Sequence, residues 1–313
     1  MRNSWLLSIL LIILIFSSGC TQGDIYQIIG WNVRQQKEVE LNDILVVESK
    51  TSIPMSPVLP GSPVKLTYII KNKDTDKSVR SVSTDIFDAC MFEVKSGGFS
   101  GETIFPRSSK YVKYELMAPT REEIGNIKHV CDIKFYVDYD FSGNTLYDIV
   151  TINPEEIEKM QQAGKKVTLH VMKGLGSGPI KLDAQVLGVK EGVIGGQEVP
   201  FEFIIANKGS GILKDNKMRA GQLHILFPQS MVGSCSNIDT ENSAGSFSCG
   251  ASGADCECTN SEDIEIFKDK SSPIIFRVTT TIPEKYQTHT VRAKFDYTYE
   301  LRDSHKIEVR PYG

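Results

Sequence analysis

The sequence predicts an all-β protein with two β-sandwich domains in tandem. A strand-and-turn pattern over Gly61–Lys73 recurs 135 positions later over Gly196–Lys208. A second pattern, Lys134-Phe135 followed by Tyr139, recurs 160 positions later. A pattern that repeats at domain length indicates duplicated domains. Aromatic and β-branched residues are frequent and helical periodicity is rare, and a length of 313 residues suits two domains.

The N-terminus has the features of an export signal. Arg2 precedes an apolar run of 11 residues, Leu6 to Phe16, which is short for a membrane span. The next four residues, Ser17-Ser18-Gly19-Cys20, resemble the lipobox of lipoproteins, although Ser17 replaces the usual aliphatic residue. The resemblance implies that Cys20 becomes a lipidated N-terminus. An uncleaved anchor over residues 1–20 and simple secretion are the alternatives, and all three place residues 21–313 outside the cytoplasm, with 21–40 as a tether.

The first domain is predicted over residues 41–153 as a series of short strands. Val64 to Lys71 alternates apolar and polar residues, and Cys131 to Phe141 places six residues on one face, which is the period of a half-buried strand. Ser142-Gly143-Asn144 predicts a hairpin turn, because these residues are typical of turns. The expected strands are 44–48, 64–71, 81–87, 110–117, 130–141 and 147–152, a spacing typical of sandwiches.

A connecting segment is predicted over residues 154–179, with a short helix at its start. Asn153 is a suitable N-cap, Pro154 occupies the first helical position, and Gly164 ends the helix. The narrow apolar stripe of this helix consists of Ile157, Met160 and Ala163. We expect a spacer that packs on one domain.

The second domain is predicted over residues 180–313, with final strands at 291–301 and 306–310. Because the repeat offset grows from 135 to 160 positions, the second copy has gained about 25 residues. This gain coincides with a Gly- and Ser-rich stretch, about 233–260, that holds four cysteines. The sequence therefore predicts a cross-linked loop inserted into a sandwich, and such loops commonly carry binding residues.

Six cysteines remain when Cys20 is assigned to the lipid, an even number that suits disulfides outside the cytoplasm. Cys90 and Cys131 are expected to pair across the first sandwich, because Cys131 faces its core. For the other four, a bridge within Cys256-Glu257-Cys258 would be strained, so one of that pair should bridge Cys235 and the other Cys249. The alternative is a zinc or redox site, but the spacing lacks paired Cys-x-x-Cys motifs.

No catalytic residue, metal site or cofactor is predicted. The five histidines are scattered, and Gly174 to Pro179 is a glycine-rich loop without the features of a phosphate-binding loop. Asp138 to Gly143 imitates the start of a calcium loop, but Ile149 stands where the bidentate Glu belongs. A net charge of −4, spread evenly, argues against nucleic-acid binding.

Two segments, Pro60–Lys73 and Gly196–Gly211, resemble the start of CARDB-type domains. These are cell-adhesion-related, immunoglobulin-like sandwiches common on archaeal and bacterial surface proteins. In them, a strand with alternating apolar residues ends in Asn-x-Gly, and the first copy departs from this pattern by having Asp74 in place of Gly. The resemblance implies two tandem immunoglobulin-like β-sandwiches joined by a short helix and used for display, spacing or adhesion.

We therefore expect a membrane-anchored extracytoplasmic binding, adhesion or scaffold protein rather than an enzyme. Its expected partner is a protein or glycan at the cell surface, contacted by the Ser210–Asp263 side of the second domain, and the membrane is reached through the N-terminus. One alternative is a structural subunit of an envelope layer or pilus assembly. Another is a thiol-dependent enzyme that uses Cys256 or Cys258.

Overall fold

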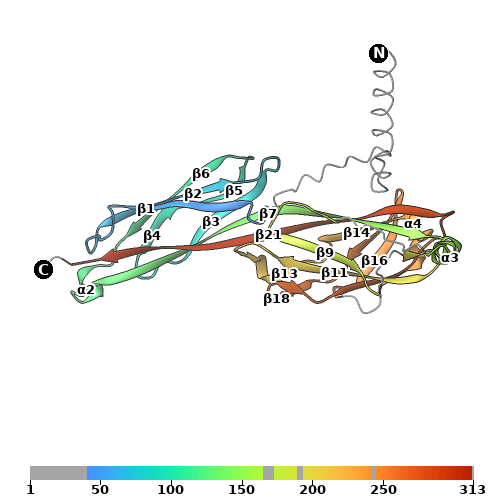
Figure 1. The fold of residues 1–313 in the computed structure, drawn as a ribbon. Coiled ribbons are helices and arrows are strands. Elements are labelled where there is room, and N and C mark those ends of the chain that lie inside the picture. Colours follow the sequence, from blue (N-terminus) through green and yellow to red (C-terminus); the bar gives the residue numbers. More distant parts are fainter. Residues whose placement is uncertain (1–40, 165–172, 189–192, 241–243, 312–313) are drawn as a thin grey trace, which may run out of the picture. The chain divides into compact units, whose positions relative to one another are not determined.

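The computed structural model describes residues 41–164, 173–188, 193–240 and 244–311 (Figure 1). In these residues the chain forms three sheets and only short helices, so the all-β prediction is confirmed. The predicted signal peptide or anchor, Cys20 and the tether fall within residues 1–40, outside the described residues.

The first sheet has four strands and covers one part of the second sheet. In β2, Val64, Leu66, Tyr68 and Ile70 are buried, as the period of two predicts. The strand order is β1 (Leu45–Ile53), β2 (Pro63–Asn72), β6 (Ser109–Met117) and β4 (Glu93–Gly97).

The second sheet is the largest and runs through both halves of the described chain. Its order is β16 (Phe247–Ser252), β17 (Asp255–Asn260), β14 (Leu223–Pro228), β21 (Tyr286–Val309), β7 (His129–Ile152), β3 (Val79–Asp88) and β5 (Phe99–Ile104). Short strands join it beside β7 and β21, namely β8 (Lys173–Leu175), β10 (Val193–Ile194) and β12 (Ile212–Leu213).

The third sheet is centred on β11 (Glu198–Asn207), the repeat equivalent of β2. Around it lie β13 (Lys217–Met218), β18 (Ile264–Phe267), β19 (Lys270–Ser271), β20 (Ile274–Thr279), β15 (Ile238–Asp239) and β9 (Ile180–Val186). The helical segments are α2 (Arg121–Ile124), α3 (Pro154–Gln162), η1 (Lys214–Asn216), α4 (Gln229–Val232) and η2 (Cys235–Asn237).

Aromatic contacts show which sheets face each other. Tyr68 of the first sheet stacks on Phe135 of the second, with ring centroids 4.1 Å apart. Phe247 of the second sheet meets Phe276 of the third at 4.9 Å. We call the sandwich-like layer pair around Tyr68 and Phe135 the first lobe, and the pair around Phe247 and Phe276 the second lobe.

The two lobes share the β7–β21 ribbon. These strands of 24 residues pair antiparallel from end to end, and Tyr139 lies directly opposite Tyr299. Because Tyr139 and Tyr299 are repeat equivalents, the ribbon has a local two-fold axis at this pair. The first lobe uses the start of β7 and the end of β21, and the second lobe uses the remaining halves. The ranges predicted for the two domains therefore contribute to one common sheet.

The predicted hairpin at Ser142-Gly143-Asn144 is wrong, because β7 continues through it without a break. A Cβ on Gly143 would lie only 2.2 Å from a ring carbon of Phe295, so the glycine makes room for this ring. The two final strands predicted at 291–301 and 306–310 are likewise one strand, β21. The buried face predicted over Cys131–Phe141 is confirmed.

The repeated strands begin and end alike. Gly61 and Gly196, which precede them, both have positive φ, 67° and 82°, a conformation that favours glycine. At the other end, Asn72 and Asn207 each accept a hydrogen bond from the backbone N–H two residues later. The internal repeat is therefore a repeat of backbone structure.

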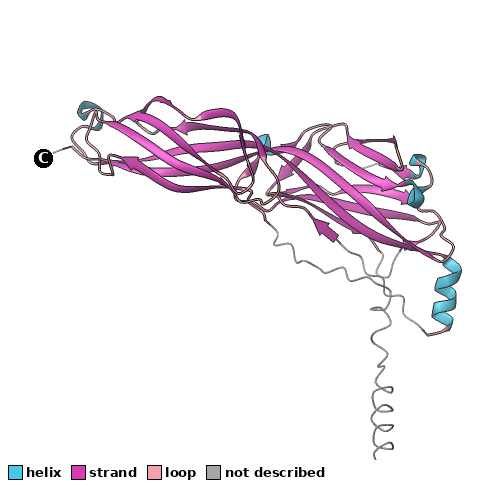
Figure 2. Ribbon diagram, turned by 90° about the horizontal axis from the view of Figure 1, so that it is seen from above, coloured by secondary structure: helices cyan, strands magenta, loops and turns pink. Residues whose placement is uncertain are grey.

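Helix α3 begins as predicted, with the Asn153 side chain accepting a hydrogen bond from the Glu155 N–H at 2.9 Å. None of its residues is fully buried, and Ile157 and Met160 of the apolar stripe are half-buried, so the helix packs only loosely. Figure 2 shows the helix projecting beyond the strands. The predicted connecting segment also contains a strand, β8, which includes Gly174 and pairs with β7.

Candidate functional site

The Cys-rich segment is a β-hairpin rather than the loop that we predicted. β16 and β17 are joined by the two residues Gly253-Ala254, and Gly253 has a φ of 63°. β17 also pairs with β14, so the hairpin extends the second sheet and β16 forms its last strand. The segment is thus part of the sandwich-like layer.

Two disulfides fix this hairpin. Cys235 pairs with Cys256 and Cys249 with Cys258, with Cα–Cα distances of 5.3 and 4.0 Å, which agrees with the expected choice of pairings. The first ties η2 to β17, and the second joins directly opposed residues of β16 and β17. Cys256 and Cys258 are fully buried. In the loop-entropy model the longer loop, closed by Cys235–Cys256, stabilises the fold by about 3 kcal/mol, and the shorter loop, closed by Cys249–Cys258, by about 2.5 kcal/mol.

Cys90 and Cys131 also form the expected disulfide, with a Cα–Cα distance of 5.6 Å. Cys90 lies in the connection from β3 to β4, where the chain leaves the second sheet for the first, and Cys131 lies in β7. The imidazole Nε2 of His129 is 3.8 Å from the Cys90 sulfur. Since all six described cysteines are paired, none offers the thiolate that a zinc cage or a thiol nucleophile requires.

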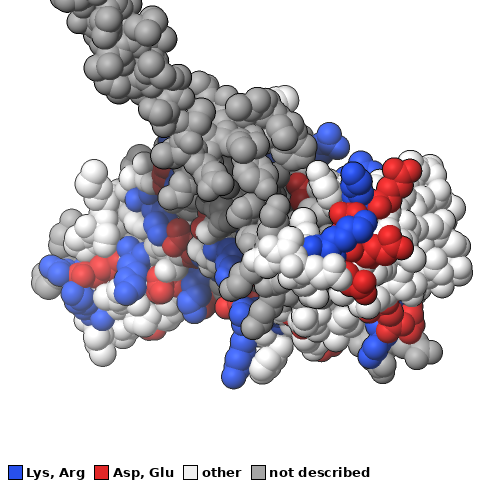
Figure 3. Space-filling model, turned by 45° about the vertical axis from the view of Figure 1, so that its right-hand side comes forward, with Lys and Arg blue, Asp and Glu red and all other residues white. Residues whose placement is uncertain are grey.

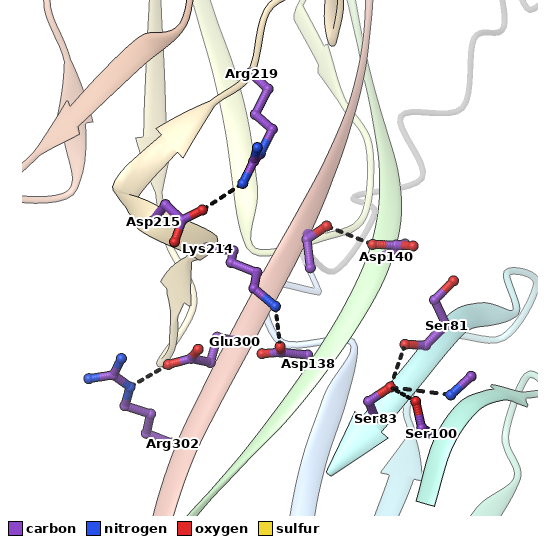
Figure 4. Close-up of polar contacts among 12 residues, drawn as sticks. Ser81, Ser83, Ser100, Asp138, Asp140, Lys214, Asp215, Arg219, Glu300 and Arg302 are labelled. Atoms are coloured by element: carbon purple, nitrogen blue, oxygen red, sulfur yellow. Dashed lines mark hydrogen bonds and ion pairs between the residues drawn. The ribbon is translucent and has the colours of Figure 1, made fainter. Parts of the chain in front are cut away.

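The residues of the suspected calcium loop are held apart on strand β7. Asp138 accepts a hydrogen bond from the Lys214 ammonium at 2.6 Å, and Asp140 accepts one from the Thr298 hydroxyl at 2.7 Å (Figure 4). The bond to Asp138 raises the pKa of Lys214. Ile149 is buried on the opposite face, so the strand does not wrap around an ion.

A polar hollow of about 750 Å³ lies beside Asp140. Lys77, at its rim, donates to the Ser142 carbonyl at 3.3 Å and lies over the Phe141 ring at 5.3 Å. The other groups that line the hollow include Asp76, Arg80 and Asp296. These groups can hydrogen-bond a polar solute.

A histidine network that the sequence did not reveal lies in the second lobe. His289 is 3% exposed, its Nδ1 is 3.2 Å from the Ser230 hydroxyl, and its Nε2 is 3.0 Å from the Thr151 hydroxyl. Burial lowers the pKa of His289. The period of two in β21 would have placed His289 on the buried face with Val291. Its partner Thr151 is not a carboxylate, so the network lacks the third member of a Ser-His-Asp triad.

Charges of both signs are interspersed on the face shown in Figure 3. Many are paired, as in Arg219–Asp215 and Arg302–Glu300 (Figure 4). Within the described residues, no helix has the length and apolar character to cross a membrane. No family model matches this chain, and neither does any curated protein.

Proposed function

We propose that this chain is a membrane-anchored, extracytoplasmic binding or scaffold protein that presents the second lobe to a macromolecular partner. In this proposal both lobes are immunoglobulin-like sandwiches, and the lipobox-like segment ending at Cys20 supplies the anchor. The chain contacts a protein or glycan at the cell surface and performs no catalysis.

The observation that carries the proposal is the concentration of cross-links at one sheet edge. Of the three disulfides among the described residues, two lie in the segment from η2 to β17, although the lobe already has a core of aromatic rings around Phe227 and Phe276. A sandwich does not need a doubly cross-linked edge hairpin to enclose its core. A rigid hairpin is useful when its geometry must be fixed before binding, because preorganisation reduces the entropy lost on association.

The hairpin can be tested in intact cells by site-specific photo-cross-linking. A photoreactive residue replaces Ser248, which is exposed on β16, and a matched variant carries it at Lys95, which is exposed on the first-lobe edge strand β4. We expect the variant at position 248 to cross-link one recurrent partner protein, and the variant at position 95 not to cross-link that partner. Equal capture from both positions, or capture only of other copies of this chain, would contradict a dedicated binding role.

Deleting the Cys-rich segment would not distinguish loss of binding from loss of folding. Cys256 and Cys258 are fully buried, and β17 lies between β16 and β14, so its removal would open the core of the second lobe. Point substitutions on β16 leave β17 in place.

A further inference from the structure

We propose that the outer edge of β16 is a strand-binding site, which accepts an extended peptide segment of a partner protein as an additional strand of the second sheet. This inference deepens the proposed function, because it names the binding surface and the form of the ligand.

The pairing of β16 with β17 shows which backbone groups face outward. The Ser261 N–H donates to the carbonyl of the opposed Ser246 at 2.8 Å, which marks a hydrogen-bonded pair. Such pairs alternate along an antiparallel ladder, so Ser248, Gly250 and Ser252 bond to β17. Phe247, Cys249 and Ala251 therefore direct their N–H and C=O groups to the outer edge.

Two further observations support this alternation. The Cα atoms of Cys249 and Cys258 are 4.0 Å apart, which suits a non-hydrogen-bonded pair because these pairs are closer than hydrogen-bonded ones. Ser252 and Asp255 close the two-residue turn, where a hydrogen-bonded pair is expected. The Phe247 carbonyl accepts from the Thr240 hydroxyl at 3.4 Å, so the outward groups used here are those of Cys249 and Ala251.

Several other sheet edges of the described chain carry features that discourage strand addition. β4 holds the Glu93–Lys95 ion pair and a register shift, and β9 carries Lys181 and Asp183. β13 and β15 have only two residues each. Charged side chains, irregular pairing and shortness are the usual protections of an edge.

β16 lacks these protections. It has six residues in regular register with β17, and none of its residues is charged or proline. Its backbone groups at Cys249 and Ala251 form an alternating row that another extended chain complements. An uncharged edge in regular register, cross-linked to its neighbour by the Cys249–Cys258 disulfide, is suited to pairing with a strand.

The side chains of β16 define the partner strand further. Phe247 faces the third sheet, since it meets Phe276, and the alternation puts Ala251 on the same side of the strand, where it is exposed. Ser248, Gly250 and Ser252 lie on the opposite, exposed face. A complementary strand therefore alternates bulky apolar residues, which continue the layer of Phe247, with uncharged polar ones. The Phe247 carbonyl already accepts from the Thr240 hydroxyl, so a second copy of β16 would pair through Cys249 and Ala251 and would place only small side chains beside them. We therefore assign the site to a different protein.

The site can be tested on the purified full chain in detergent, with all three disulfides intact. The probe is a synthetic peptide that alternates Ile or Val with Thr and carries Lys at both ends, and the readout is residue-resolved amide hydrogen exchange. Without the probe, the Cys249 and Ala251 amides should exchange faster than those of Ser248 and Gly250. With the probe, we expect exchange at Cys249 and Ala251 to slow by about tenfold or more.

Two substitutions at one position separate backbone pairing from side-chain contact. Ala251→Pro removes an outward N–H donor and should weaken probe binding by about tenfold, whereas Ala251→Val keeps the donor and should bind like the wild type. Intact disulfides and slow exchange at Gly250 show that the proline variant keeps its hairpin. Equal binding by the proline variant and the wild type overturns the inference.

The other possible outcomes of these experiments also test the strand-binding inference. Protection at Cys249 and Ala251 that grows with protein concentration in the absence of the probe assigns the edge to a second copy and overturns the inference. No protection with the probe overturns it as well. If Ser248 cross-links a partner in cells while Ala251→Pro leaves that capture unchanged, the proposed function stands and the strand-pairing inference fails.

Discussion

The two copies of the repeated strand end in the same turn, but the residue two positions after the Asn differs between them. In both, an Asn side chain accepts the N–H two residues later, from Asp74 in the first lobe and from Gly209 in the second. At Gly209 a Cβ would lie 2.5 Å from the Tyr299 hydroxyl, so only glycine fits there.

The Asp74 side chain makes hydrogen bonds that the equivalent Gly209 cannot make. Its carboxylate accepts hydrogen bonds from the backbone N–H groups of Asp76 and Lys77 and from the Ser177 hydroxyl. Burial alone would raise the pKa of Asp74, but these hydrogen bonds lower it. The comparison teaches that the repeat preserves the backbone, while each lobe has its own side-chain chemistry around it.

The largest expected difference between the lobes concerns their disulfides. Cys90 and Cys131 are 41 positions apart, and Cys249 and Cys258 only 9. In the loop-entropy model, replacing the first pair with Ala costs about 4 kcal/mol and replacing the second about 2.5 kcal/mol. Urea denaturation of the two double variants measures both costs. A larger loss from the shorter loop would show that native-state contacts, rather than loop closure, decide the difference.

The local two-fold axis makes a second comparison possible within the ribbon. Gly143 lies opposite Phe295, and their repeat equivalents, Asp303 and Phe135, lie opposite each other in the first lobe. Gly143→Ala forces a methyl group into the Phe295 ring and should cost about 2 kcal/mol.

Asp303→Ala is the matched variant, because Asp303 is part-exposed and loses its ion pair with Lys50 and the hydrogen bond that it accepts from the Ser304 N–H. We expect a loss below about 1 kcal/mol. Thermal and chemical denaturation measure both variants. Similar losses for the two would indicate that the ring moves aside and that the glycine is not required.

The central tyrosines of the ribbon provide a third comparison. The Tyr299 hydroxyl donates to the Asn207 side chain and accepts from the Gly211 N–H, both at 2.9 Å. The Tyr139 hydroxyl is buried and has no hydrogen-bond partner in the described part of the chain. Tyr299→Phe should therefore cost about 1 kcal/mol or slightly more, and Tyr139→Phe should be neutral or stabilising. Denaturation midpoints measure both, and equal losses would contradict the difference in bonding.

Local patterns in the sequence predicted much of this fold. The alternation from Cys131 to Phe141 gave the buried face of β7, and the close spacing of Cys256 and Cys258 restricted the disulfide pairing correctly. These features depend on neighbouring residues. The continuation of β7 through Gly143 depends instead on pairing with β21, more than a hundred residues later, so the local turn signal was misleading.

The candidate site was predicted only in part. Four cysteines in a Gly- and Ser-rich stretch indicated a cross-linked segment, but sheet pairing with β14 made it a hairpin with an open edge. The His289 network joins residues from β7, α4 and β21, and no spacing in the sequence brings Thr151 and Ser230 to that histidine. Contacts assembled from three distant segments are visible only in the fold.

Histidines at equivalent positions allow the finest comparison, since His129 and His289 are 160 positions apart in the repeat. His129 is half-buried beside Cys90, while His289 is buried between two hydroxyls. Burial lowers the pKa of His289 from its ordinary value near 6.5. Below that pH the unfolded chain binds a proton that the folded chain does not, so the contribution of His289 to stability is complete above pH 6.5 and declines as the pH falls.

His289→Gln should therefore flatten the loss of stability below pH 6.5, and His129→Gln should retain that loss. The free energy of unfolding, measured from pH 5 to 8, tests this expectation. His305 provides an internal check, because burial and the nearby Lys50 also lower its pKa and should leave a residual slope in His289→Gln. If His289→Gln kept the full slope, the pH dependence would belong to the first-lobe end of β21, and the hydroxyl network would only position the ring.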